Sequence, residues 1–374
     1  MGEAEEVRRR SGAANVCSLQ WGAVGGDRRR IPLRWTQAED AVADALFPDE
    51  TALDRHVGTG EFEGMEFLHV NARSIINAVP PSSRMPFRYT INAYRGCSHA
   101  CAYCFARPTH DYLGLGIGED FERRIVVKVN AVERLRADLR SPKWQGDHIA
   151  MGTNTDPYQH AEGKYHLTRG IVQTLAEVAN PFSILTKSTL VLRDLAVLEQ
   201  AARRTSVRCN ISVGTLDRSV WKLSEPGTPP PDRRLAAVRR LNGAGIPCGV
   251  LLAPVLPGLS DGDDQIRQVA EACLDAGAVS VTAVALHLRP GVRRHFMDWL
   301  AEHRPDLVPL YRSRFGRASY QPPAEQARLT ELVSAVVAGR PPRRAAPTAD
   351  RPGHVERHPS VTSLPTRHEQ LRLL

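Results

Sequence analysis

Residues 92–107 read NAYRGCSHACAYCFAR, and they set Cys97, Cys101 and Cys104 in a C-x3-C-x2-C pattern. The pattern directly follows Tyr89–Tyr94, the first run of residues that predicts a buried strand. Three thiolates on one short loop can each bind one iron of a 4Fe-4S cluster and leave the fourth iron without a protein ligand. The spacing therefore predicts a metal centre that keeps an open coordination position, as catalytic metal sites do.

A zinc ion on the same three cysteines is the alternative. Three cysteines and one histidine form a common zinc ligand set, and His99 or His110 would complete it. Zinc sites usually pair a C-x2-C with a second pair on a separate hairpin, and no second pair follows in this chain. The spacing therefore favours the iron–sulfur cluster.

The remaining cysteines and the apolar stretches bear on the compartment. The chain has seven cysteines, an odd number, and three of them lie within eight residues, which is not the layout of a secreted disulfide framework. The first ten residues are charged, and the longest apolar stretch, Ile246–Leu259, contains three prolines. We therefore expect a cytoplasmic protein without an export signal or a membrane span. The other cysteines are expected to be small core side chains: Cys17, Cys209, Cys248 and Cys273.

From Tyr89 onward, short apolar runs alternate with amphipathic segments, which is typical of parallel strands joined by crossover helices. The predicted strands are Tyr89–Tyr94, His148–Gly152, Phe182–Thr186, Arg208–Gly214, Pro247–Ala253 and Ser280–Leu286. The predicted helices between them are Ala131–Arg140, Thr168–Ala179, Arg193–Arg203, Asp232–Asn242 and Gln265–Ala276. Six units are too few for an eightfold barrel, so we expect an α/β fold with a partial (β/α)6 barrel.

The organisation along the chain follows from these elements. We expect an irregular N-terminal extension over residues 1–85, the partial barrel over 86–290, a helical cover over 291–338 and a disordered tail over 339–374. The helices of the cover are expected at His295–Glu302 and Pro323–Val337. The net charge is +8, and the tail carries seven arginines against three acidic residues. A solvated tail explains this basicity best, and contact with a phosphate-rich partner is the alternative.

The cysteine pattern, with Tyr103 just before its last cysteine, resembles the radical S-adenosylmethionine (SAM) superfamily. More narrowly, the runs Tyr94–Cys97, Gly152–Gln159, Leu185–Ser188 and Ala253–Val255 are similar to the branch related to spore photoproduct lyase, and within it to an uncharacterised actinobacterial group. The resemblance implies an enzyme that binds SAM at a 4Fe-4S cluster and cleaves it reductively to a 5'-deoxyadenosyl radical, which abstracts hydrogen from an unidentified substrate. It also implies a reductant such as ferredoxin or flavodoxin.

The same resemblance, and the rule that parallel barrels carry their sites at the carboxyl ends of the strands, select six candidate SAM-binding residues. They are Tyr103, Thr155, Asp156, Lys187, Ser212 and Ala253. Thr155 and Asp156 would lie near the methionine end of SAM, or form a turn in which Asp156 only accepts from backbone donors. Lys187 would meet the SAM carboxylate, or be a surface lysine at a strand end. Ser212 would face SAM, or a neighbouring helix, and the backbone at Ala253 would line the adenine.

One departure from the branch limits what the resemblance implies. Spore photoproduct lyase returns hydrogen to its DNA substrate from a cysteine near the position of residues 154–156, and this chain has no cysteine from 150 to 179. Thymine-dimer repair is therefore not expected, and no catalytic residue beyond the cluster ligands follows from the sequence. Further candidates for contact with an acidic substrate, or for plain helix starts and solvent-facing positions, are Arg233, Arg234, His287, Arg289 and Arg293.

Three functions follow as hypotheses. The first is a radical SAM enzyme, with a lyase or a transferase-type modifying activity on an unidentified substrate. The second is a nucleic-acid lyase or repair enzyme of the spore photoproduct lyase type, which would bind DNA through its folded core in a salt-sensitive way. The third is a zinc-stabilised binding protein without catalysis.

Overall fold

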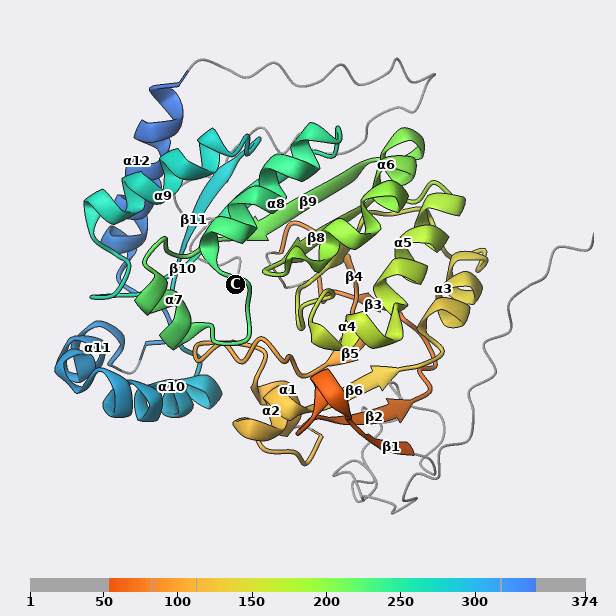
Figure 1. Ribbon diagram of the computed structural model, residues 1–374, viewed down its shortest axis with the longest axis horizontal. Coiled ribbons are helices and arrows are strands. Elements are labelled where there is room, and N and C mark those ends of the chain that lie inside the picture. Colours follow the sequence, from red (N-terminus) through yellow and green to blue (C-terminus); the bar gives the residue numbers. More distant parts are fainter. Residues whose placement is uncertain (1–53, 82, 84, 112, 317, 341–374) are drawn as a thin grey trace, which may run out of the picture.

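A seven-stranded sheet in the order β3-β4-β7-β8-β9-β10-β11 forms the centre of the fold (Figure 1). The six strands from β4 to β11 pair in parallel, and β3 pairs antiparallel with β4 at one edge. The computed structural model describes residues 54–340, apart from 82, 84, 112 and 317. The strands are β3 (Ile76–Ala78), β4 (Tyr89–Ile91), β7 (Ile149–Met151), β8 (Phe182–Thr186), β9 (Val207–Ser212), β10 (Cys248–Val255) and β11 (Val281–Ala285).

Helices alternate with these strands along the chain, so each parallel pair is joined by a crossover. They are α3 (Ala131–Leu139), α5 (Leu167–Glu177), α6 (Leu195–Arg204), α8 (Pro231–Gly243) and α9 (Asp263–Asp275). Each buries one apolar stripe. In α5, for example, Leu167, Ile171 and Leu175 are buried at a spacing of four residues. The expected partial (β/α)6 barrel is therefore confirmed.

A second, four-stranded sheet was not expected. It has the order β1-β2-β6-β5, with β1 (Asp54–Val57), β2 (Glu66–Val70), β5 (Tyr94–Arg95) and β6 (Arg124–Lys128). The described part of the range expected to be irregular thus contains β1, β2 and β3. The strand β2 escaped prediction because it is buried on both faces, with Phe67 in the main core and Leu68 in a separate apolar cluster, so it lacks strict alternation.

The run Tyr89–Tyr94 was predicted as one strand, and the structure divides it between the two sheets. β4 pairs with β7 in the large sheet, whereas β5 pairs antiparallel with β6 in the small one. The buried Tyr94 donates its hydroxyl hydrogen to Glu162 Oε2 at 2.5 Å, which ties β5 to the helix His160–Tyr165. The chain therefore leaves the large sheet just before the first cysteine.

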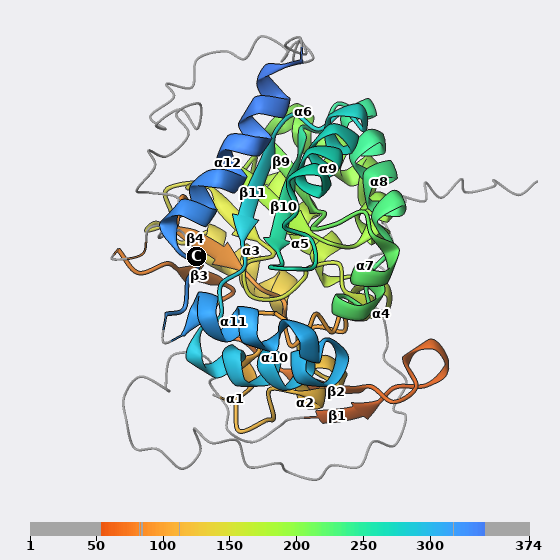
Figure 2. The same ribbon diagram turned by 90° about the vertical axis from the view of Figure 1, so that its left-hand side faces the viewer.

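The C-terminal helices are α10 (Pro290–His303), α11 (Val308–Phe315) and α12 (Pro323–Ala338). In Figure 2, β10 and β11 point toward the end of the barrel at which α10 and α11 lie, and α12 runs beside β11 and α9. α11 was not predicted, and neither were the short helices α1 (Pro108–Asp111), α2 (Glu119–Arg123), α4 (His160–Tyr165) and α7 (Arg218–Ser224) or the 3-10 turns at Gly60–Phe62, Thr189–Asp194 and Pro305–Leu307. Most of the tail expected to be disordered, and Cys17, lie outside the described residues.

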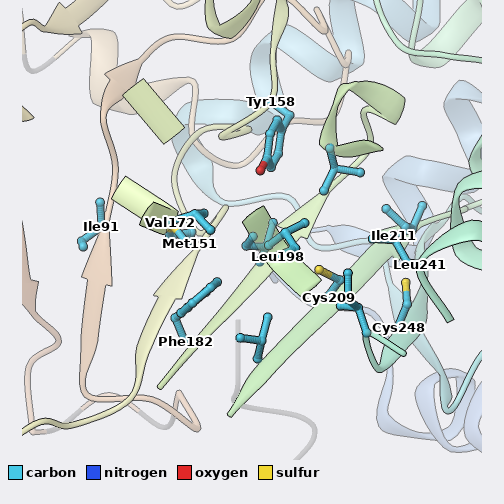
Figure 3. Close-up of a cluster of buried hydrophobic side chains, with 14 of the residues drawn as sticks. Ile91, Met151, Tyr158, Val172, Phe182, Leu198, Cys209, Ile211, Leu241 and Cys248 are labelled. Atoms are coloured by element: carbon cyan, nitrogen blue, oxygen red, sulfur yellow. The ribbon is translucent and has the colours of Figure 1, made fainter. Parts of the chain in front are cut away.

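The main core lies between the large sheet and its helices, and Figure 3 shows part of it. Cys209, Cys248 and Cys273 are fully buried there, as the sequence predicted. Burial raises the pKa of Cys209 and of Cys273 to about 12, so both remain neutral thiols in the physiological range. Across the described part of the chain, every helix is too short or too polar to cross a lipid bilayer.

The chain comes very close to β8 at Gly152, where there is no room for a side chain. It follows β7 with φ +89°, and a Cβ atom at this position would lie 1.9 Å from the carbonyl oxygen of Leu185. Gly152→Ala is therefore expected to lower the free energy of unfolding by about 2 kcal/mol or more. Urea denaturation followed by far-UV circular dichroism measures this change.

Gly163→Ala is the matched control. Gly163 lies within α4, and apart from the backbone of its own helix no atom would lie within 4 Å of a Cβ atom at this position. This change is expected to be neutral or stabilising by about 0.5 to 1 kcal/mol. Equal denaturation midpoints for the two variants would show that the close approach at Gly152 has no energetic weight.

Candidate functional site

The three cysteines lie on one loop, Cys97–Cys104, which begins two residues after β5 and which we name the cysteine loop. Cys97 and Cys101 are 7% and 6% exposed, and Cys104 is half-buried. Burial raises the pKa of Cys97, and the nearby groups of Asp156, Cys101 and Cys104 raise it further. Cys104 packs against the two apolar clusters that contain Cys97 and Cys101, and none of the three cysteines forms a disulfide.

The first support of the cysteine loop comes from the segment after β7. Thr155 Oγ1 donates to the carbonyl of Gly96 at 2.6 Å, and Gln159 Nε2 donates to the same oxygen at 2.9 Å. Gln159 Oε1 also accepts from the backbone N–H of Ser98 at 3.0 Å. Both side chains are buried, so these hydrogen bonds are protected from competition by water.

A second support comes from Arg107, which is fully buried. Its Nε and Nη2 atoms donate to the carbonyl of Cys101 at 3.2 and 2.9 Å, and Nη1 donates to the carbonyl of Ile117 at 2.9 Å. Nη2 also pairs with Glu122 at 2.5 Å. The planar guanidinium thus ties the middle of the cysteine loop to the segment before α2.

The third support is the segment Ser224–Thr228, at the end of α7. The N–H of Ala102 donates to the carbonyl of Ser224 at 3.0 Å, and the N–H of Gly227 donates to the carbonyl of His99 at 3.1 Å. A Cβ atom at Gly227 would lie 2.2 Å from the carbonyl oxygen of Ser98. Only glycine therefore allows this segment to dock on the cysteine loop.

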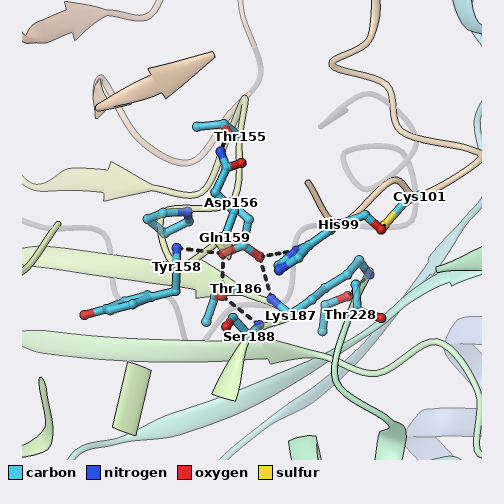
Figure 4. Close-up of polar contacts among 12 residues, drawn as sticks. His99, Cys101, Thr155, Asp156, Tyr158, Gln159, Thr186, Lys187, Ser188 and Thr228 are labelled. Atoms are coloured by element: carbon cyan, nitrogen blue, oxygen red, sulfur yellow. Dashed lines mark hydrogen bonds and ion pairs between the residues drawn. The ribbon is translucent and has the colours of Figure 1, made fainter. Parts of the chain in front are cut away.

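Asp156 receives contacts from four groups of the chain (Figure 4). Thr186 Oγ1 and the N–H of Tyr158 donate to Oδ1 at 2.6 and 2.9 Å, and the N–H of Lys187 donates to Oδ2 at 2.7 Å. His99 Nδ1 lies 3.3 Å from Oδ2, within ion-pair distance but not aligned for a hydrogen bond. Burial alone would raise the pKa of Asp156, but the neighbouring His99 and the other donors outweigh it and lower that pKa.

Three of the other predicted residues lie around the ammonium group of Lys187. Nζ donates to Ser212 Oγ at 2.7 Å and to the carbonyl of Ala253 at 3.2 Å, and it lies 5.6 Å from the ring centroid of Tyr103. The side chain of Lys187 is 15% exposed, so it is not a surface lysine. Ser212 Oγ donates to the carbonyl of Ala253 at 2.8 Å, so it faces the end of β10 rather than a helix.

Glu225 is a functional candidate that the sequence reasoning missed. Its buried carboxylate accepts from the Tyr103 hydroxyl and from Arg234 Nη2, and it pairs with Lys187 Nζ at 3.1 Å. Burial raises its pKa, but the charges of Arg234 and Lys187 together with the hydrogen bonds outweigh burial and lower the pKa of Glu225 from 4.5 to about 2. Glu225 is therefore a buried, ionised group that links two cations.

Arg234 was considered for contact with an acidic substrate, and the structure contradicts that assignment. Its side chain is 1% exposed and also donates to the carbonyls of Ser212 at 3.0 Å and Pro229 at 2.7 Å. The signal for burial was present in the sequence. Ala237, Val238 and Leu241, at the +3, +4 and +7 positions from Arg234, form the buried stripe of α8, so Arg234 occupies a core-facing position.

Among the candidate residues after β11, some are likewise bonded within the protein and others are exposed. Arg293 donates to the carbonyls of Leu288 at 3.2 Å, Gly316 at 3.0 Å and Ala318 at 2.6 Å, so its guanidinium supports a loop. His287 is buried, stacks on Tyr320 and meets the ring of Phe105 at a tilt, whereas Arg289 is exposed. Arg233, at the start of α8, is also exposed.

The zinc alternative gains no ligand from the fold. His110 Nε2 contacts the carbonyl of Arg124 at 2.9 Å, and His99 Nδ1 faces Asp156. Within residues 54–340, gaps excepted, no three side chains of the His, Cys, Asp and Glu types gather at spacings that fit a single metal ion. Two buried thiols and one half-buried thiol on a single loop are the donor set that a 4Fe-4S cluster with one open iron requires.

Comparisons with known proteins agree with this geometry. The sequence profile of the radical SAM superfamily matches residues 91–271. The uncharacterized protein Rv2578c of Mycobacterium tuberculosis is 44% identical over 313 residues, which cover 82% of this chain and 92% of that protein. The chain belongs to the radical SAM superfamily. The uncharacterized protein MJ0683 of Methanocaldococcus jannaschii is 30% identical over 197 residues, covering 53% of this radical SAM protein and 70% of the relative.

Solved structures extend the comparison to the fold. Spore photoproduct lyase complexed with dinucleoside spore photoproduct superposes with a TM-score of 0.53 and 20% identity, over 73% of this chain and 79% of that one. A cysteine-to-alanine mutant of the same lyase, also with the dinucleoside, gives a TM-score of 0.54 and 19% identity, over 78% and 86% of the two chains. This radical SAM protein therefore shares the fold of spore photoproduct lyase.

Removing the charge of Glu225 should destabilise the protein, because Lys187 and Arg234 would then face each other without a carboxylate. Glu225→Gln is expected to lower the free energy of unfolding at pH 7 by about 3 kcal/mol. The pKa of Glu225 is lowered in the folded state, so its contribution is complete above about pH 4.5 and is lost as the pH falls toward 2. Urea denaturation of both proteins at several pH values between 7 and 3 measures this difference.

Asp232→Asn is the matched control, since Asp232 forms an ion pair with Arg218 at 2.9 Å in which both side chains are more than 60% exposed. This change should cost less than about 0.5 kcal/mol. If the two variants unfold alike, or if their difference persists unchanged at pH 3, the ionised Glu225 does not stabilise the fold.

Proposed function

We propose that this protein is a radical SAM enzyme that holds one 4Fe-4S cluster on Cys97, Cys101 and Cys104 and binds SAM beside it. When bound, the cluster and SAM supply the chemistry of the family, which is reductive cleavage of SAM to methionine and a 5'-deoxyadenosyl radical for hydrogen abstraction. The observation that carries the proposal is the cysteine loop itself. Its three thiols lie on a backbone that is held by the buried side chains of Gln159 and Arg107 and by the backbone of Ser224–Thr228.

Lys187 is the residue that we assign to the carboxylate of SAM. Lys187 and Arg234 share the single carboxylate of Glu225, so two positive charges face one negative charge and the group carries an excess of one positive charge. An uncompensated charge in a buried site is costly. An anionic group of a ligand offsets this cost, and the SAM carboxylate has the charge and the hydrogen-bonding geometry for it.

Ser212, Ala253 and Tyr103 hold Lys187 for that contact. The Ser212 hydroxyl and the Ala253 carbonyl accept from Nζ, and the Tyr103 ring lies beneath it. We assign the backbone at Ala253 to the adenine side of SAM, because Ala253 lies near the carboxyl end of β10 and its carbonyl is in contact with Lys187. Each of these residues positions or binds, and none of them has to transfer a proton.

Thr155 and Asp156 are assigned to the methionine end of SAM. The Thr155 hydroxyl is committed to the carbonyl of Gly96, and the Asp156 carboxylate is in contact with four groups of the chain. Three of these contacts are hydrogen bonds, so a carboxylate with about four lone-pair positions keeps capacity for about one more donor. Thr155 therefore acts on SAM through the carbonyl that it holds in place, whereas Asp156 can also accept a hydrogen bond from the SAM amino group.

The partners of the reaction are a reductant, such as ferredoxin or flavodoxin, and an unidentified substrate. The solved complex of spore photoproduct lyase contains a dinucleoside, but at 20% identity the likeness concerns the fold. Two arginines were considered for contact with an acidic substrate, Arg234 and Arg293. Their guanidinium groups instead donate hydrogen bonds to backbone carbonyls of the protein. The substrate therefore has to be found by experiment rather than by analogy with the lyase.

Anaerobic reconstitution with iron and sulfide, followed by reduction with dithionite in the presence of SAM, tests the proposal. Wild-type protein should become brown, bind about four irons and release 5'-deoxyadenosine, which chromatography detects. Cys101→Ala should release none. Cys273→Ala is the matched control, because this cysteine is buried in the main core, and the variant should retain the wild-type activity.

Colourless wild-type protein that retains zinc and releases no nucleoside would overturn the proposal in favour of a zinc-stabilised binding protein. Equal losses in Cys101→Ala and Cys273→Ala would show that the assay reports general destabilisation. In that case the cysteine loop would have no special role in the reaction.

A further inference from the structure

The cysteine loop and the residues just after it reach the surface at one side chain. Among residues 97–107, only Phe105 is exposed, at 40%, and it directly follows Cys104, the least buried of the three cysteines. The ring of Phe105 meets the ring of His287, with 5.8 Å between the centroids. A partner molecule can therefore come close to the cluster ligands at Phe105.

Two segments of the C-terminal cover meet beside Phe105. Residues 286–297 lead from the end of β11 into α10, and residues 307–324 contain α11 and the turn after it. The segments are joined where the N–H of Leu288 donates to the carbonyl of Ser319 at 2.7 Å. Together they contain six arginines and neither aspartate nor glutamate. The sequence therefore concentrates positive charge in these two segments.

Three of these arginines form a surface that we name the basic corner: Arg289, Arg293 and Arg294. Burial, and then the nearby charge of Arg289, lower the pKa of His287 to about 4, so Arg289 lies close to the ring that meets Phe105. Arg293 donates to backbone carbonyls of both segments. Arg289 and Arg294 are exposed, and neither forms a hydrogen bond or an ion pair with any residue that the structure describes. The charges of these two are available to a partner.

The helix α10 brings the basic corner next to the cysteine loop. Its buried residues Val292 and Phe296 pack in the same apolar cluster as Cys101. Arg294 lies between Val292 and Phe296 in the sequence but is exposed, so it points away from that cluster and toward solvent. Only the width of one helix, about 10 Å, therefore separates Arg294 from the cysteine loop.

We propose that the basic corner docks an acidic electron-carrier protein of the flavodoxin type, which delivers the electron that reductive cleavage of SAM consumes. The inference rests on the proposed function and assigns a surface to its reductant. One electron leaves the carrier and enters the cluster, and no bond forms or breaks at the surface. Opposite charges steer such a partner, arginine and phenylalanine are enriched at protein interfaces, and electron-transfer complexes need only a small contact area.

An anionic substrate is the other partner that a basic surface attracts. The residues that we assign to SAM meet the cysteine loop at Tyr103, whose ring lies beside Lys187, whereas the basic corner meets it at Phe105. A substrate has to reach SAM, while an electron carrier needs only to come close to the cluster. The position of the basic corner therefore favours the carrier.

Surface plasmon resonance of flavodoxin on the anaerobically reconstituted, unreduced protein tests this surface without turnover. The double variant Arg289→Glu/Arg294→Glu should weaken flavodoxin binding about tenfold or more at low salt, and the difference from wild type should narrow as salt screens the charges. Arg239→Glu/Arg240→Glu is the matched control, because it makes the same change of charge at two exposed arginines near the C-terminal end of α8. This control should bind flavodoxin as wild type does.

The rate of SAM cleavage gives a second readout. With flavodoxin hydroquinone as the reductant, the apparent KM for flavodoxin should rise about tenfold or more in Arg289→Glu/Arg294→Glu. With dithionite, which is small and needs no docking surface, the rate should equal that of wild type. Iron and sulfide contents, measured for each variant, report whether the cluster has formed.

The outcomes distinguish this inference from the proposed function. Wild-type affinity for flavodoxin in Arg289→Glu/Arg294→Glu, or an equal loss in both double variants, would overturn the inference and leave the function standing. If flavodoxin binding is unchanged but binding of a short DNA duplex is lost, the basic corner serves an anionic polymer, which also overturns it. If wild type releases no 5'-deoxyadenosine with dithionite, the proposed function itself fails.

Discussion

The structure depends on one constraint: the backbone of a short loop with three thiols is held in place mainly by groups that lie outside the loop. The cysteine loop forms neither a helix nor a strand, and only some of its carbonyl and N–H groups pair within the loop, as Ala100 does with Cys97 and Cys104 with Cys101. Groups outside the loop satisfy others: Arg107, just after the loop, and, from distant parts of the chain, Thr155 and Gln159 after β7 and Ser224–Thr228 at the end of α7. The barrel therefore serves as a frame that brings these segments to one end.

Beside the loop, the buried charges are arranged around a single carboxylate. Glu225 contacts Lys187, Arg234 and Tyr103, which come from the end of β8, from α8 and from the cysteine loop. Buried ion pairs are a poor source of net stability, because desolvation of the charges offsets most of their attraction. Here the ion pairs serve to position side chains, since Glu225 fixes the places of the Lys187 and Arg234 cations. These three side chains together keep an excess of one positive charge.

The sequence predicted the parts of this protein that are encoded locally. Phe182–Thr186 was recovered as a strand without error because it is a short, mostly apolar run between two helical segments, and the C-x3-C-x2-C pattern stood out because its spacing is local. The small sheet was missed, since β5 has two residues and β2 is buried on both faces. Gln159 and Glu225 were missed for another reason. Their partners lie 63 and 122 residues away in the sequence, and no pattern within one chain reveals such a pairing.

The long sequence separation of these contacts affects the order in which the protein is assembled. Tyr103 reaches Glu225 across 122 residues, and Gly96 reaches Thr155 across 59. A chain emerging from the ribosome exposes its cysteines well before these partners are synthesised, and the cost of closing such loops is met only when the barrel packs. The thiols of the nascent chain would therefore be unarranged and open to oxidation or to adventitious metals. Under the proposed function, delivery of iron and sulfur would accordingly follow the closing of the barrel around the loop.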